Sequence, residues 1–217
     1  MNPFKYILDL IYPPACVFCE AILKDGDMCP ECEKKLPYTK GDAICQKFKY
    51  VKYCYSPLYY EGDVRESIMR YKFFGCRTYY KRYAQILSEC VENNLDCGSV
   101  HMVSWVPISR QRMHKRGYNQ AELIAREMAG ILELKAAPCL KKIKNNSPQS
   151  RKNSASERAE NVKNVYKVLP KAEVKGKTIL LIDDVVTTGS TISECARMLK
   201  LAGAECVYAA SVARHKD

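Results

Sequence analysis

Residues Lys177–Thr191 have the sequence Lys-Thr-Ile-Leu-Leu-Ile-Asp-Asp-Val-Val-Thr-Thr-Gly-Ser-Thr, and this stretch decides the fold. Ile179–Ile182 form a continuous apolar run, which is typical of a strand buried on both faces of a parallel sheet. Two carboxylates, a hydroxyl-rich turn with one glycine and an amphipathic helix follow in that order. The stretch therefore predicts a strand–turn–helix unit of an α/β sheet.

The predicted helix has a start signal and a stop signal. Thr191 and Glu194 have capping-box spacing, in which each side chain would accept a bond from a backbone N–H of the first turn. Gly203 stands where a glycine commonly ends a helix. We expect a helix with both features.

The turn before this helix is expected to bind a phosphate group. Backbone N–H groups at a helix N-terminus are unpaired and have partial positive charge. Gly189 allows the backbone to approach an anion closely. Further donors come from four hydroxyl side chains: Thr187, Thr188, Ser190 and Thr191.

The acids Asp183 and Asp184 need a different partner, because carboxylates are poor phosphate ligands. They can accept bonds from hydroxyl groups, or they can bind a Mg²⁺ ion that bridges them to phosphate. A sugar phosphate with a free diol would supply both kinds of partner. A turn with two solvated aspartates is the alternative interpretation.

Other phosphate motifs fit poorly. The sequence has no G-x-x-x-x-G-K-[ST] and no G-x-G-x-x-G. A phosphatase D-x-D needs both acids on one face of a strand, whereas Asp183 and Asp184 are adjacent and point to opposite faces.

The stretch resembles the signature of type I phosphoribosyltransferases, which bind 5-phosphoribosyl-1-pyrophosphate (PRPP). In that family the two acids hold the ribose 2′- and 3′-hydroxyls, and the loop after them binds the 5′-phosphate. The resemblance implies a type I phosphoribosyltransferase fold, a twisted and mostly parallel sheet flanked by helices. It also implies PRPP and Mg²⁺ as ligands, with Asp183 and Asp184 as catalytic residues.

The length and composition of the chain limit how many domains it can form. The chain has 217 residues, which suffice for one α/β domain with a small appendage, and 47% are hydrophobic. We expect a unit at 1–55 and a phosphoribosyltransferase-like domain at 56–217. The formal net charge of +11 favours anionic partners.

No signal peptide or membrane span is expected. Phe4–Tyr12 is apolar but is interrupted by charged residues and ended by prolines, so we expect a short amphipathic helix there. Twelve cysteines without a secretion signal indicate a reducing compartment, and we expect a cytoplasmic protein.

Four cysteines form a C-x₂-C…C-x₂-C array: Cys16, Cys19, Cys29 and Cys32. Two such pairs can give one ion four thiolates, which predicts a closed, structural zinc site. Cys45 and Cys54 stand outside C-x₂-C pairs, so we assign no metal to them. Lysines and tyrosines alternate near them, which suits single-stranded nucleic acid or an exposed strand face equally well.

A strand at Met102–Val106 is followed by cations on what we expect to be a basic loop. Because such a loop follows a strand's carboxyl end, it would lie on the ligand edge of an α/β sheet. Its guanidinium and ammonium groups could bind pyrophosphate. The candidates are Arg110, Lys115 and Arg116.

The string Arg116-Gly-Tyr-Asn-Gln120 resembles the hallmark of the ComF (GntX-like) branch of these proteins. Lys72-Phe-Phe-Gly75 resembles a second motif of that branch, and the zinc module fits it as well. Residues near 144–161 lack hydrophobic periodicity, which predicts a mobile hood loop or a disordered insertion. Gln149, Arg158 and Asn161 match family positions there, and Arg158 would contact the phosphates.

The resemblance to ComF implies a role in DNA uptake and natural transformation, with other DNA-uptake proteins as partners. Two functions remain open. One is phosphoribosyl transfer from PRPP to an acceptor that no motif identifies. The other is non-catalytic binding of single-stranded DNA, with PRPP only as a ligand or signal.

Overall fold

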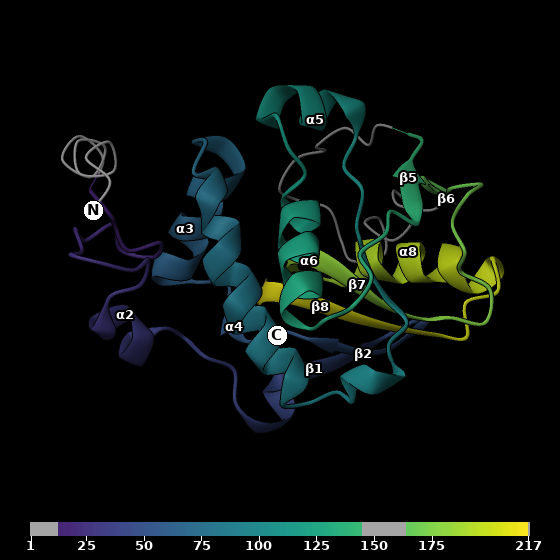
Figure 1. Cartoon of the computed structure of the whole chain (residues 1–217), viewed down its shortest axis with the longest axis horizontal. Coiled ribbons are helices and arrows are strands. Elements are labelled where there is room, and N and C mark those ends of the chain that lie inside the picture. Colours follow the sequence, from purple (N-terminus) through teal and green to yellow (C-terminus); the bar gives the residue numbers. More distant parts are fainter. Residues whose placement is uncertain (1–12, 145–163, 217) are drawn as a thin grey trace.

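The computed structural model describes residues 13–144 and 164–216, and its centre is a six-stranded sheet (Figure 1). The main path has the order β1-β2-β8-β7-β4, and the short β3 also pairs with β8. The bounds are β1 Cys45–Phe48, β2 Val51–Tyr55, β3 Leu58–Tyr59, β4 Met102–Trp105, β7 Thr178–Val186 and β8 Cys206–Arg214. Within this six-stranded sheet only the β1–β2 pairing is antiparallel, so the expected mostly parallel α/β sheet is confirmed.

Helices cover both faces of this sheet. The helices α4 (Tyr80–Glu92) and α6 (Gln120–Ile131) pack on one face, beside α3 (Gly62–Phe73). The helix α8 (Ser190–Leu201) packs on the opposite face (Figure 1). Both faces of β7 are therefore buried, which explains its continuous apolar run.

Alternate residues of β7 enter two different cores. Leu180 and Ile182 belong to the cluster that contains residues of α4 and α6, whereas Ile179 and Leu181 belong to the cluster that contains residues of α8. This is the two-residue period of a strand. Asp183 and Asp184 follow in the same strand, so the sheet separates their side chains.

Smaller elements surround the sheet. The helix α2 spans Pro30–Lys35, and 3₁₀ turns lie at Gly41–Ile44, Arg77–Tyr79 and Cys97–Ser99. The strands β5 (Leu140–Lys142) and β6 (Tyr166–Val168) form a separate antiparallel pair. The hood loop expected near 144–161 falls between them in sequence. All of it after residue 144 lies outside the described part of the chain, as does the predicted helix at Phe4–Tyr12.

The predicted basic loop after β4 is a helix, so that expectation was wrong. The helix α5 spans Arg110–Arg116, and the Ser109 hydroxyl caps it by accepting a bond from the Arg112 backbone N–H. Gly117 ends it in the left-handed conformation, with φ 76°. The cations therefore have a fixed spacing on one helix.

The predicted capping box of α8 is also wrong. Gly189 is the N-cap and no side chain caps this helix. Glu194 instead accepts a 2.7 Å bond from the backbone N–H of Asn164 and pairs with Arg197. The expected end is confirmed, because Gly203 follows the helix with φ 92° and its N–H bonds to Lys200.

The strands β1 and β2 lie within residues 1–55 but belong to the main sheet. Cys54 and Tyr55 pair with Ala209 and Ala210 of β8. The division at residue 55 stays a prediction, and these two strands join the first unit to the second. Within the described residues no helix has the length and apolar character required to cross a membrane.

Candidate functional site

The acid pair lies near the carboxyl end of β7, and its two members meet different surroundings. Asp184 Oδ1 is 2.7 Å from Lys72 Nζ, near the end of α3, and both side chains are largely buried. Asp183 lies toward the α8 side, where Cys195 and Tyr166 are electrostatic neighbours. The backbone N–H of Asp184 donates to Asp183 Oδ1 at 2.9 Å, which fixes the first carboxylate.

Burial and the adjacent Asp184 carboxylate raise the pKa of Asp183 from 3.8 to about 7. Lys72, the Asp184 N–H and Arg112 oppose this rise. Asp183 therefore changes its charge near neutral pH. An aspartate with a shifted pKa at the C-terminal end of a parallel strand is typical of a ligand site.

Cations border the acids on both sides. Arg116 is half-buried, its guanidinium lies 4.8 Å from the centre of the Phe73 ring, and it donates to Gln120 Oε1 at 2.8 Å. Burial lowers the pKa of Arg116, and Asp184 opposes that change. On the other side, burial and Arg112 lower the pKa of Lys142. Such a concentration of positive charge suits a phosphorylated ligand.

Side chains of the Arg-Gly-Tyr-Asn-Gln string hold the end of α5, and with it Arg116, in place. The Asn119 side chain caps α6 by accepting from Ala121 N, and it donates to the carbonyl of Val106 at 3.0 Å. The Tyr118 hydroxyl donates to the carbonyl of Tyr71. These bonds tie the start of α6 to the end of β4 and to α3. They thereby fix the position of α5, which directly precedes the anchored segment.

The proposed phosphate loop lies between β7 and α8. Thr187 and Thr188 are exposed, and the Thr188 and Ser190 hydroxyls lie 2.8 Å apart. Gly189 has φ 68°, a conformation that glycine adopts without strain. Since no side chain caps α8, the end of this helix can accept an anion.

The predicted site residues fall into three groups. The structure brings together Asp183, Asp184, Arg116 and the loop Thr187–Thr191. Arg110 and Lys115 are exposed on α5, and among the described residues no contact joins them to the acids. Arg158, like Gln149 and Asn161, lies outside the described residues. The roles of all these residues stay predictions.

Sequence reasoning missed two cations near the acids, Lys72 and Lys142, and it named Arg112 only among the cations of the 110–116 segment. Lys72 was visible only as part of a family motif, and Lys142 gave no signal. All three influence Asp183 or pair with Asp184. Their proximity depends on the packing of α3, α5 and β5 around one sheet edge, which no local pattern encodes.

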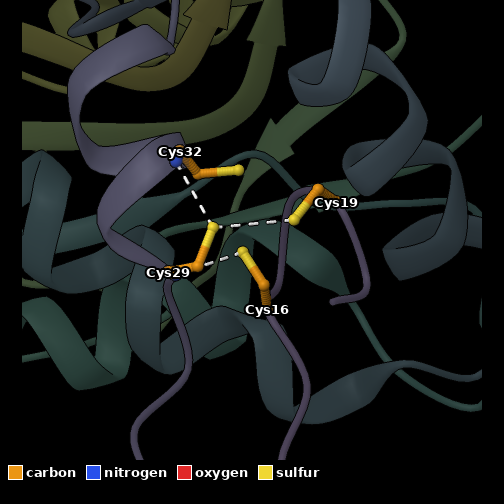
Figure 2. A group of neighbouring side chains, drawn as sticks. All are labelled: Cys16, Cys19, Cys29 and Cys32. Atoms are coloured by element: carbon orange, nitrogen blue, oxygen red, sulfur yellow. Dashed lines mark hydrogen bonds between the residues drawn. The ribbon is translucent and has the colours of Figure 1, made fainter. Parts of the chain in front are cut away.

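The four predicted zinc ligands form one cluster (Figure 2). Their Sγ atoms all lie within 4.8 Å of one another. Four thiolates at about 2.3 Å from a zinc ion have sulfur–sulfur distances of about 3.8 Å, so the cluster fits a tetrahedral site after small adjustments. Cys19 Sγ and Cys29 Sγ are 3.7 Å apart, and the Cys32 N–H donates to Cys29 Sγ at 3.3 Å.

One thiol of the cluster is poised to ionise, whereas burial raises the pKa of Cys32. Burial raises the pKa of Cys16, but hydrogen bonds from three backbone N–H groups outweigh it and lower that pKa to about 7. A thiolate is the ligand form of cysteine. Neighbouring Val17 and Phe18 are buried in the main core, so the metal site is anchored to the domain.

Two family models match the sequence. The phosphoribosyl transferase domain matches residues 115–217, and the double zinc ribbon domain matches residues 7–55. Relatives cover the chain between these matches. A competence protein F of Haemophilus influenzae is 28% identical over 92% of this chain and 90% of its own length.

The chain belongs to the ComF family. The phosphoribosyltransferase fold and the N-terminal four-cysteine module that the sequence predicted are both confirmed. Competence protein ComFC of Streptococcus pneumoniae is 30% identical over 71% of the chain and 65% of its own length. The DNA utilization protein YhgH of Escherichia coli is 34% identical over 47% of this chain and 44% of its own length.

Solved structures resemble the chain in part. An adenine phosphoribosyltransferase of Thermoanaerobacter pseudethanolicus is 13% identical, with a TM-score of 0.41 over 65% of this chain and 83% of that one. A glutamine PRPP amidotransferase of B. subtilis is 18% identical, with a TM-score of 0.44 over 66% of this chain and 30% of that one.

The second half of a double zinc ribbon is not present within the described residues of this ComF protein. Cys45 pairs with Tyr55, and Cys54 pairs with Gln46, across β1 and β2. Neither cysteine joins a cluster of metal-ligand side chains in the described residues. Burial raises the pKa of Cys54 to about 12, which disfavours a thiolate at that position.

Proposed function

We propose that this ComF protein binds PRPP with Mg²⁺ at the carboxyl end of β7. The observation that supports this most directly is the acid pair. Its two carboxylates lie on opposite faces of β7, each near cationic side chains, and beside them α8 begins without a side-chain cap. Asp183 and Asp184 would accept bonds from the ribose hydroxyls. The loop Thr187–Thr191 would bind the 5′-phosphate.

The remaining cations suit the pyrophosphate. Arg116 and Arg112 lie on α5, at the ligand edge of the sheet. Mg²⁺, when bound, would neutralise pyrophosphate charge and help it leave. In a transfer reaction the bond from ribose C1 to the pyrophosphate oxygen breaks, a bond from C1 to the acceptor forms, and the acceptor loses a proton. Positioning and charge stabilisation suffice for such chemistry.

Calorimetry with PRPP and Mg²⁺ tests the site. The wild type should bind PRPP, and the Asp183→Asn/Asp184→Asn double variant should lose that binding while it remains folded. Equal binding by both proteins would refute the site. Pyrophosphate release in the presence of single candidate acceptors then separates a transferase from a protein that uses PRPP only as a ligand.

A second candidate function is binding of single-stranded DNA, and the β1–β2 hairpin supports it. Three lysines there lie over tyrosine rings: Lys47 over Tyr53, Lys49 over Tyr50 and Lys52 over Tyr208, at 5.3–5.4 Å. Alternating cations and aromatic rings can contact phosphates and stack on bases. This role accords with the names of the relatives, competence protein F and competence protein ComFC.

A further inference from the structure

Phe48 makes a close contact with the proposed phosphate loop. The phenylalanine ends β1, and its ring lies against Gly189, more than a hundred residues later in the sequence. A Cβ atom added to Gly189 would overlap ring atoms Cδ1, Cε1 and Cγ of Phe48. The ring therefore packs on the backbone of the loop itself, and glycine is needed there for space as well as for its φ of 68°.

The hairpin holds the ring in this place. Lys49 and Tyr50 form the turn between β1 and β2, and Phe48 pairs with Val51 across it. Val51 is buried in the same core cluster as Ile192 of α8, and Phe48 packs against that cluster. Because β2 is hydrogen-bonded to β8, the turn cannot move away from the loop without a cost to the sheet.

The ring covers one side of the loop and leaves the other open. Gly189 is buried, whereas Thr187 and Thr188 are exposed. The hydroxyl groups that would meet a phosphate therefore remain accessible. An aromatic ring that packed over these hydroxyls would have buried them instead.

We propose that Phe48 is a positioning residue of the phosphate loop. By packing on Gly189 it restricts the backbone of Thr187–Thr191 to the conformation that presents N–H groups to an anion. The N-terminal hairpin thus completes a site that otherwise belongs to the β7–α8 unit. This inference rests on the proposed function, and it adds to that function a residue outside the matched phosphoribosyl transferase domain.

The first test measures the loop without any ligand. Hydrogen exchange of the Ser193 amide, which donates to the Gly189 carbonyl at 2.8 Å, should be about tenfold faster in Phe48→Ala than in wild type, because a loop that loses the ring also loses the packing that restrains this carbonyl. Phe48→Leu keeps an apolar contact and should restore most of the protection. Unchanged exchange in Phe48→Ala would overturn the proposal, whether or not the protein binds PRPP.

The second test measures PRPP affinity against a matched control. Val207→Ala removes a buried side chain from the same core cluster, in β8 beside Ile179 at the other end of β7. Phe48→Ala should weaken PRPP binding about tenfold, equal to about 1.4 kcal/mol. Val207→Ala should lower the melting temperature and leave PRPP affinity within about twofold. Tighter binding in Phe48→Ala, or equal losses in both variants, would overturn the proposal.

The third test is a double-variant cycle. Gly189→Ala alone should weaken PRPP binding severely, since the new methyl group meets both the ring and an unfavourable φ. In the Phe48→Ala background the same change should cost less, because the ring is gone. Strict additivity would overturn the direct contact. If wild type binds no PRPP, the proposed function fails, and the exchange measurement alone decides the role of Phe48.

Discussion

Lys72 Nζ lies 2.7 Å from Asp184 Oδ1, and this ion pair joins the end of α3 to the acid pair of β7. The exposed fractions are 17% for the lysine side chain and 14% for the aspartate side chain, so water screens the pair only weakly. Few ion pairs in the described residues are as enclosed, and this one lies at the proposed ligand site.

We expect Lys72→Met to destabilise the protein by about 1–3 kcal/mol at pH 8, because it leaves a largely buried carboxylate without its counter-charge. Urea unfolding measures the change. Lys216→Met is the matched control, since the Lys216–Glu61 pair is well exposed and should contribute less than about 1 kcal/mol. Similar losses in the two variants would contradict the account of Asp184.

Asp183 should make stability depend on pH near neutrality. Its folded-state pKa of about 7 exceeds the ordinary value of 3.8, so the folded protein binds the proton more tightly than the unfolded chain does. This group's contribution is therefore most favourable below pH 3.8 and falls as the pH rises toward 7.

Asp183→Asn keeps an acceptor for the Asp184 N–H and removes the titration. We expect it to raise the melting temperature by a few degrees at pH 8, and to have little effect at pH 4. Parallel thermal melts of wild type and variant between these pH values give the difference. A gain that is the same at every pH would show that the carboxyl does not titrate abnormally.

The four-cysteine cluster should hold one zinc ion per chain, and zinc should stabilise the module. Structural zinc supplies about 10–16 kcal/mol in finger peptides, so Cys29→Ser or a strong chelator should expose the buried segment around Phe18 to hydrogen exchange. Metal analysis together with exchange measures this. Cys97→Ser, outside the cluster, should keep the zinc and the protection.

The β1–β2 hairpin should contribute to any binding of single-stranded DNA. Lys47→Gln, Lys49→Gln and Lys52→Gln together should weaken binding and reduce the slope of log affinity against log salt by about 2, since each phosphate contact contributes about 0.7. Gel shifts at several salt concentrations measure both. A matched triple variant, Lys135→Gln, Lys171→Gln and Lys175→Gln, removes exposed lysines elsewhere and should keep the slope. Equal changes in the two triples would place DNA binding away from the hairpin.

Local patterns predicted the elements whose physics is local. The β7 strand follows from its apolar run, the end of α8 from Gly203, and the zinc cluster from two short cysteine spacings. Two predictions failed because a side chain formed a different hydrogen bond. Ser109 caps a helix where the cations suggested a loop. Glu194 bonds to Asn164 and Arg197 and does not complete a capping box.

The sequence by itself determined the acid pair, the glycine turn and the helix after it, because one continuous segment contains all of them and backbone geometry sets their order. Only the tertiary structure decided which residues meet that segment. Lys72 reaches Asp184 through the packing of α3, and Phe48 reaches Gly189 through a hairpin paired with β8. These contacts join residues more than a hundred positions apart, and they form because burying both faces of one sheet brings distant elements to the same edge.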